Sequence, residues 1–250
     1  MEPLDFVGKD PAMEIIPVLD LFGGVVVRGV GGRRDEYRPI QSLLTTDPSP
    51  TAVLDAFLDR LSVQTVYVAD LDAIIHGEPN LALISELARR PVELMVDAGV
   101  TSVLHAQSLC DVGVTRIIAA SESLPDSAML RELIDRFSSE SIVFSMDMKG
   151  GEPVVAADEL SSMDQSQIVM KAAQAGATQF LLLDLADVGE ANGVRTLPLL
   201  ARLRTELPAC WFAVGGGVRS MNDVFAAQQA GADAVLVASA LHDGRIAFQQ

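Results

Sequence analysis

The chain has 250 residues, of which 49% are hydrophobic, and its formal net charge is −16. This length and composition fit one large domain or two small ones with a well-filled apolar core. The pI of about 4.4 argues against nucleic acid or an anionic membrane as a partner, because a strongly negative chain is repelled by both.

The cysteines and the first twelve residues indicate the cellular compartment in which the protein is expected. Cys110 and Cys210 show neither the spacing of metal ligands nor a disulfide framework, which fits a reducing cytoplasm. Residues 1–12 lack the basic and apolar regions of a signal peptide and are interpreted as a loose leader. No apolar stretch reaches membrane-spanning length. The three histidines are scattered, so we expect neither a metal nor a cofactor.

Apolar runs alternate with helical patterns through residues 13–250. Strands are expected at 15–20, 65–70, 92–96, 115–119, 142–147, 179–184, 211–214 and 234–237. Helices are expected at 51–61, 81–89, 103–112, 126–137, 165–175, 197–207 and 222–230, with a short last helix in 245–250. The strands are apolar throughout, as in a parallel sheet covered on both faces. Eight such units predict a single (β/α)8 barrel, with an open doubly wound sheet as the alternative.

Short motifs recur between the two halves of the chain. Val96–Ser102 is similar to Val214–Ser220, and the Asp-x-x-Gly-Gly pattern that begins at Asp20 returns at Asp147. The pattern indicates two half-barrel repeats, at about 13–125 and 140–245. A two-fold repeat favours the closed barrel over the open sheet.

A glycine triplet lies between an expected strand and an expected helix. Gly215, Gly216 and Gly217 allow the backbone to approach a ligand closely and to point several N–H groups at one place. This arrangement is typical of a phosphate site. The alternative is a tight turn that binds nothing.

Carboxylates end several of the expected strands. Asp20 ends the first strand and Asp147 the fifth, and these strands lie on opposite sides of an eight-stranded barrel. We expect the two side chains to face each other across the mouth as a general acid and a general base. The alternative is that each caps a turn. Asp70, Asp72 and Asp184 end the second and sixth strands, where they hold loops or neighbouring side chains or contact the substrate.

Five motifs together resemble the HisA/HisF half-barrel family of histidine biosynthesis, and its isomerase branch more than its cyclase branch. They are IPVLDL at 16–21, VADLD at 68–72, GEPN at 77–80, FSMDMKGG at 144–151 and GGGVRS at 215–220. The resemblance implies a (β/α)8 barrel whose substrate has a phosphate at each end and undergoes an Amadori rearrangement. It implies that Asp20 and Asp147 are catalytic, without saying which is the acid. It places phosphate loops at Gly216, Gly217 and Arg219 and at Ala238, Ser239 and Ala240.

The first half departs from the family pattern. Its glycine-rich loop contains Asp97 and Gly99, and the loop after the fourth strand contains Ser121 and Glu122. Two carboxylates would repel a phosphate, so we expect this half to have lost its phosphate site and to face a cationic or hydroxyl-rich group. The alternative is that both carboxylates face solvent. Arg33, in the charged loop at 31–37, is a candidate for new substrate contacts.

The sequence therefore predicts an isomerase of a phosphorylated, sugar-like small molecule that resembles the HisA isomerase and has a degenerate first phosphate site. Two alternatives stay open. One is a divergent HisA-related enzyme of one-carbon, methanopterin-linked metabolism with a different substrate. The other is a non-catalytic barrel that serves as a binding partner. The oligomeric state is left open.

Overall fold

Eight parallel strands close into a ring. The computed structural model describes residues 13–61, 63–190 and 192–246, so the expected leader at 1–12 lies outside the described residues. The ring runs through β1 (Glu14–Phe22), β4 (Thr65–Asp70), β5 (Glu93–Asp97), β6 (Arg116–Ala120), β7 (Ile142–Lys149), β9 (Gln179–Asp184), β10 (Trp211–Gly215) and β11 (Ala234–Val237). Parallel pairing of β11 with β1, with Leu236 beside Ile16, closes it. The predicted (β/α)8 barrel is confirmed, and the open-sheet alternative is wrong.

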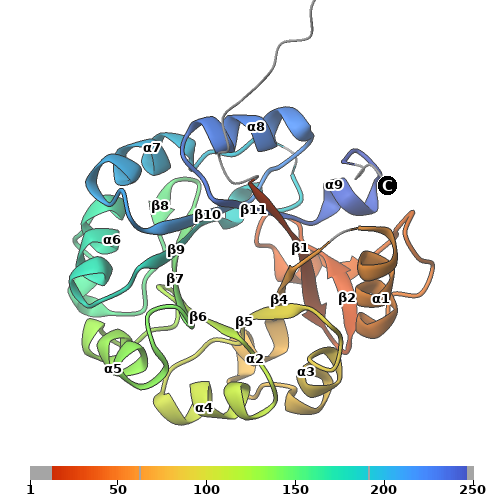
Figure 1. The fold of residues 1–250 in the computed structure, drawn as a ribbon, viewed down its shortest axis with the longest axis horizontal. Helices are drawn as coiled ribbons and strands as arrows, with labels where there is room; N and C mark the ends of the chain where they lie inside the picture. The colour runs from red at the N-terminus through yellow and green to blue at the C-terminus, as the bar shows by residue number, and fades with distance from the viewer. Residues whose placement is uncertain (1–12, 62, 191, 247–250) are drawn as a thin grey trace, which may run out of the picture.

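Helices surround the ring on its outside (Figure 1). They are α1 (Pro50–Arg60), α3 (Leu81–Leu87), α4 (Val103–Asp111), α5 (Ser127–Phe137), α6 (Gln165–Gln174), α7 (Leu197–Glu206) and α8 (Met221–Gln229). Each lies within a few residues of its predicted range, because each has apolar residues at helical spacing that pack onto the strands.

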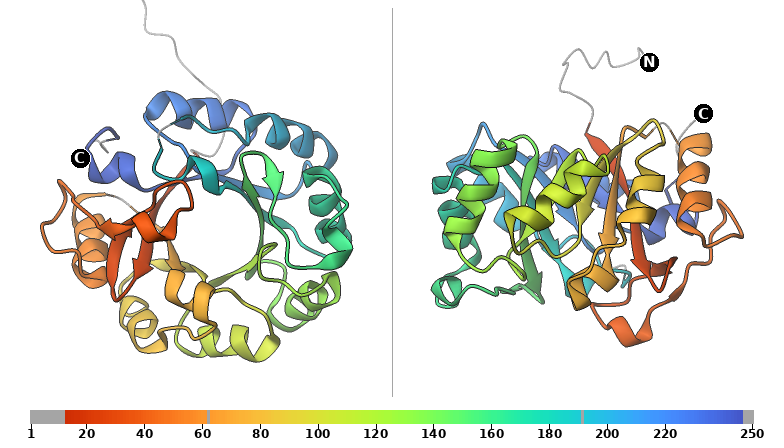
Figure 2. Two further views of the ribbon diagram at one scale, coloured as in Figure 1. Left: turned by 180° about the vertical axis from the view of Figure 1, so that it is seen from behind. Right: turned by 90° about the horizontal axis from the view of Figure 1, so that it is seen from below.

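Short elements lie at the end of the barrel where the carboxyl ends of its strands are found. They are the antiparallel strands β2 (Val25–Arg28), β3 (Arg38–Pro39) and β8 (Glu152–Pro153), the 3-10 turns η1 (Arg34–Glu36), η2 (Asp158–Leu160) and η3 (Leu185–Asp187), and the helices α2 (Leu71–His76) and α9 (Ser239–His242). Figure 2 shows the segment with η1 projecting beyond the end at which β1 finishes. The prediction of a last helix in 245–250 is wrong for the part described: α9 ends at His242, Arg245 and Ile246 form a bend, and 247–250 lie outside the described residues.

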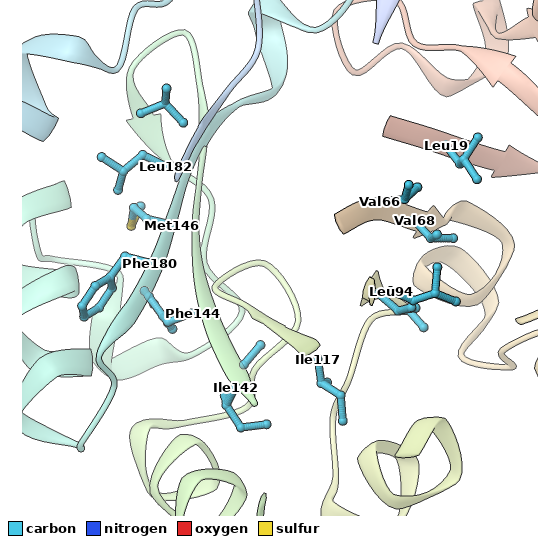
Figure 3. Close-up of a cluster of buried hydrophobic side chains, with 14 of the residues drawn as sticks. Leu19, Val66, Val68, Leu94, Ile117, Ile142, Phe144, Met146, Phe180 and Leu182 are labelled. Carbon is cyan, nitrogen blue, oxygen red and sulfur yellow. The ribbon is translucent and has the colours of Figure 1, made fainter. Parts of the chain in front are cut away.

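Side chains alternate between two cores along each strand. Val66 and Val68 point outward into the layer between strands and helices, with Leu19, Leu94, Phe180 and others drawn in Figure 3. Tyr67 and Ala69, between and beside them, point into the barrel. Because both faces are buried, the strands read as continuous apolar runs.

This alternation decides where the carboxylates at the strand ends point. Asp20, Asp97 and Asp147 continue the inward-facing series of β1, β5 and β7. Asp70 and Asp184 continue the outward-facing series of β4 and β9. The first three therefore point towards the barrel mouth, and the last two point towards the surrounding loops.

Strands β1 and β7 are four places apart in the eight-membered ring, so they are opposite each other. The predicted two-fold repeat of half-barrels stays a prediction. Among the described residues, no helix combines the length and the apolar character that crossing a membrane requires.

Candidate active site

A cavity of about 390 Å³ opens at the carboxyl ends of the barrel strands, where active sites of such barrels form. Its charged and aromatic lining comprises Asp20, Asp35, Tyr37, Tyr67, Asp97, Glu122, Asp147, Lys149 and Arg245. The five acidic side chains outnumber the two basic ones. Asp20 and Asp147 both line this cavity, so the structure brings the two predicted catalytic carboxylates to one shared space.

Asp20 projects from the inner face of β1, between Ala69 on β4 and Val27 on β2. Burial within the ring raises the pKa of its carboxyl to about 7. At neutral pH the protonated and ionised forms are therefore both populated, which suits a group that gives or takes a proton.

Asp147 is held firmly in place. Its side chain is 2% exposed, and the Ser145 hydroxyl donates to Oδ1 at 2.7 Å. The Ser121 hydroxyl and the Glu122 backbone N–H lie 3.4 Å from Oδ2. Burial raises the pKa of Asp147 well above its usual value, and the negative charges of Glu122 and Asp97 raise it further. Ser121, predicted as part of an altered binding site, therefore positions Asp147.

The glycine loop after β10 forms one rim of the cavity. Gly216 and Gly217 have φ values of 89° and 80°. A Cβ at Gly217 would lie 2.1 Å from the Gly193 carbonyl oxygen, so only glycine fits there. Ala238 and Ser239, after β11, complete this rim, whereas Gly215 and Ala240 are not among the cavity-lining residues. Between the described residues, no hydrogen bond from the N–H of Gly217 or Ser239 is found.

The cation at this rim differs from the predicted one. The Arg219 guanidinium binds Asp223 with two hydrogen bonds, of 2.9 and 2.7 Å, and does not line the cavity. Arg245 lines it instead, with Nη1 3.3 Å from the Arg219 carbonyl oxygen and Nη2 3.0 Å from Asp243. Arg219 and Arg245 are each paired with an aspartate, and of the two only Arg245 lines the cavity.

The opposite rim, after β5 and β6, is acidic. Asp97 and Glu122 line the cavity, whereas Gly99 and Ser121 lie behind it. Asp97 is 5% exposed; its Oδ1 accepts the Gly99 N–H at 3.0 Å and its Oδ2 lies 3.4 Å from the Tyr67 hydroxyl. The alternative that Asp97 simply faces solvent is therefore wrong.

Three other predicted acidic residues hold loops. Asp70 accepts the backbone N–H groups of Ala73 and Asn80 at 3.0 and 2.9 Å. Asp72 accepts the N–H of Gly23 at 2.7 Å. Asp184 accepts those of Gly150, Gly151 and Ala186, at 2.7 to 3.0 Å. None of the three lines the cavity.

Arg33 is likewise engaged by its own surroundings. Its guanidinium pairs with Glu36 at 2.9 Å and with Glu190 at 2.7 Å, and it does not line the cavity. These contacts tie the loop after β2 to the loop after β9.

Sequence reasoning missed Tyr37, Tyr67, Lys149 and Arg245. Tyr67 carried a usable signal, because its place in the strand alternation puts it on the inner face next to the site. Its phenol is buried among carboxylates, so burial and then the charges of Asp97 and Asp147 raise its pKa well above the usual value. Within the described part of the chain, no group of three or more His, Cys, Asp or Glu side chains is arranged to hold a metal ion.

Comparison with known proteins agrees with this geometry. Residues 14–247 match the family described as histidine biosynthesis protein. An uncharacterised protein of Methanocaldococcus jannaschii is 32% identical over 242 residues, covering 95% of this chain and 97% of that protein.

Two archaeal relatives have a named activity. Proteins of Haloarcula marismortui and Natronomonas pharaonis are each 30% identical, over 94% and 96% of this chain and 93% and 97% of their own lengths. Both are named imidazole-4-carboxamide isomerases, and the substrate in the full name carries two phosphoribosyl groups. The chain therefore belongs to the histidine biosynthesis protein family, whose relatives with a named activity here are isomerases.

Proposed function

We propose that this protein is an isomerase of the aldose–ketose type that acts on a phosphorylated, sugar-like small molecule. The observation that carries the proposal is the placement of Asp20 and Asp147 on opposite strands of the ring, both lining one cavity. Membership of the family supports the reaction class.

The two carboxyl groups suit the two proton transfers of an Amadori-type rearrangement. One protonated carboxyl donates a proton to the ring oxygen, and the ring opens. The other, ionised, takes the proton from C2 and leaves an enediol or enaminol with a C1–C2 double bond. A proton then returns to C1 while the hydroxyl on C2 loses its proton, which gives the ketose. The pKa of Asp20 is about 7, so this carboxyl can be either protonated or ionised near neutral pH, and the raised pKa of Asp147 favours its protonated form.

The glycine rim is the candidate phosphate site. Gly217, Ser239 and Arg245 all line the cavity, and the N–H groups of Gly217 and Ser239 have no hydrogen-bond partner among the described residues. Backbone N–H groups together with an arginine bind phosphate by charge-assisted hydrogen bonds. Such local contacts can act against the negative charge of the whole chain, because they lie within hydrogen-bond distance of the ligand.

Turnover of a panel of phosphorylated aldoses and aminoaldoses, followed by NMR, tests the proposal. We expect at least one of them to isomerise, and Asp20→Asn or Asp147→Asn to lower kcat by about 10²–10⁴. Glu132→Gln, an exposed substitution on α5, is the control and should leave kcat unchanged. Unchanged kcat in either aspartate variant would refute the assignment of that residue, and no turnover of any sugar in the panel by the unaltered chain would favour the non-catalytic barrel.

The identity of the substrate is a separate question. The rim after β5 and β6 carries two carboxylates, Asp97 and Glu122, whereas the glycine rim carries none among its described residues. This difference favours a substrate other than that of the named isomerases. This supports the alternative of a divergent HisA-related enzyme with a different substrate.

A further inference from the structure

We propose that the substrate of this barrel carries a single phosphate, and that Asp97 and Glu122 select against a second one. The inference rests on the proposed function, because it specifies the molecule bound in the same cavity. It is drawn from the difference between two rims that face each other across the ring.

The two rims occupy corresponding places in the barrel. The glycine rim follows the adjacent strands β10 and β11, and the acidic rim follows the adjacent strands β5 and β6, four places away in the ring. Gly99 has a φ of 63°, comparable with the left-handed Gly217 at 80°. Both loops therefore have the backbone shape that exposes N–H groups, and they differ in what those groups bind.

At the acidic rim the N–H groups already bind anions that belong to the protein. The Gly99 N–H donates to Asp97, and the Glu122 N–H donates to Asp147. A phosphate would have to displace these carboxylates from their donors. Since Asp147 is a proposed catalytic group, displacement would also disturb the reaction centre. The N–H groups of Gly217 and Ser239 have no such partner among the described residues.

Helix α2 packs against the backbone at Gly99, as Gly193 packs against Gly217 at the other rim. A Cβ built on Gly99 would lie 3.0 Å from the Cα of Ile74 and 3.6 Å from the carbonyl oxygen of Ala73. The helix is held there by Asp70, which accepts the N–H groups of Ala73 and Asn80. Backbone atoms of α2 therefore sit next to the loop, and they cannot move aside as a flexible side chain can.

The negative charges at the acidic rim also disfavour the binding of a second phosphate. Asp97 is buried and Glu122 is partly buried, so the repulsion of a phosphate dianion by their charges is weakly screened. An ionised carboxylate only accepts hydrogen bonds. The part of the substrate that meets this rim therefore presents hydroxyl or amino groups, as the Tyr67 hydroxyl already does to Asp97.

A matched pair of ligands tests the inference by calorimetric titration. D-Ribulose 5-phosphate and D-ribulose 1,5-bisphosphate differ only in the second phosphate. We expect the monophosphate to bind at least about tenfold more tightly, because like charges brought together at a binding site are strongly disfavoured.

Isosteric variants separate the charge from the fold. The double substitution Asp97→Asn with Glu122→Gln removes both charges and should abolish most of this preference. The control Glu132→Gln with Asp135→Asn removes two charges from the exposed face of α5 and should leave the preference intact. A melting temperature measured for each variant verifies that it is folded.

Several results would overturn the inference. They are equal or tighter binding of the bisphosphate by the unaltered chain, an unchanged preference in the Asp97/Glu122 variant, or failure of both sugars to bind. Rescue of a histidine auxotroph that lacks the isomerase would also contradict it, because the named substrate of the relatives has two phosphoribosyl groups.

Failure of the proposed function would look different. A chain that prefers the monophosphate but isomerises nothing would refute the isomerase and retain the single-phosphate site. A chain that isomerises a substrate with two phosphates would do the reverse.

Discussion

Asp20 has the pKa that a proton-transferring carboxyl needs, and it has it because of where its strand places it. Burial inside the ring raises the pKa to about 7. We expect kcat to show a pH limb near pH 7 that disappears in Asp20→Asn, measured on whichever substrate turns over. A profile that is flat between pH 6 and 8 in the unaltered enzyme would contradict this role.

The raised pKa of Asp20 also costs stability. The folded pKa lies above that of the unfolded chain, so the ionised form is disfavoured on folding. The penalty is absent below about pH 4, grows between about pH 4 and 7, and is constant at higher pH. Asp20→Asn should therefore raise the free energy of unfolding at pH 8 by about 1–2 kcal/mol, while activity is lost. Urea unfolding at pH 8 and pH 4 measures it, and equal effects at both pH values would contradict it.

At the scale of elements, we expect α2 to affect both the stability of the fold and the preference for a monophosphate, because it packs beside the Gly99 loop. Asp70 is 2% exposed and accepts two backbone N–H groups. One of them belongs to Ala73 in the first turn of α2, so Asp70 caps this helix. Asp70→Ala should lower the free energy of unfolding by about 2 kcal/mol, because it removes a helix cap and leaves a second donor without a partner.

The same substitution should weaken the preference for the monophosphate, because α2, which packs beside Gly99, is no longer held in place by Asp70. Denaturant titration and the matched ligand pair measure the two effects. Thr51→Ala on α1, far from Gly99, is a control for ligand preference. A loss of stability below about 0.5 kcal/mol would show that the cap is dispensable.

The elements differ in how well the sequence predicts them. Strands β4 and β7 are found correctly because both faces are buried and the residues before Asp70 and Asp147 are mostly apolar. Helix α2 was missed because its six residues are too short to show a helical repeat and lie directly after a strand.

The positions of the site residues were easier to predict from the sequence than the directions in which their side chains point. Asp20 and Asp147 were expected to share one space and both line the cavity, while their catalytic role stays a prediction. The loop-holding role left open for Asp70 and Asp184 follows from their opposite place in the strand alternation. Arg219 was assigned to the phosphate because its partner Asp223, four residues later, was not considered. Arg245 reaches the cavity only through the path of the chain after α9, which no local pattern encodes.

At the scale of the whole molecule, a buried histidine at the end of α9 contacts α1 and the segment before it. The His242 ring lies 5.4 Å from that of Phe57 on α1, and its Nδ1 is 2.9 Å from the Ser42 hydroxyl. Burial lowers the pKa of His242 to about 4, and the charge of Arg28 acts in the same direction. The folded chain therefore keeps this histidine neutral.

This histidine should make the fold sensitive to acid. As the pH falls from about 6.5 to 4, the unfolded chain takes up the proton and the folded chain does not, so stability is lost over this window. Relative to His242→Gln, the unaltered chain should lose up to about 3 kcal/mol of unfolding free energy. Urea unfolding at pH 7.5 and pH 4.5 for both chains measures it. A difference that does not change with pH would contradict it.

The barrel brings two distant halves of the chain to one cavity, and the account depends on the two aspartates sharing one substrate there. Exchange of the C2 hydrogen of a bound sugar phosphate with solvent deuterium, followed by NMR, tests this most directly. We predict exchange in the unaltered protein and its loss, by about 10²–10⁴, when the aspartate that takes the C2 proton is changed to asparagine. Exchange that persists undiminished in both Asp20→Asn and Asp147→Asn would contradict the account.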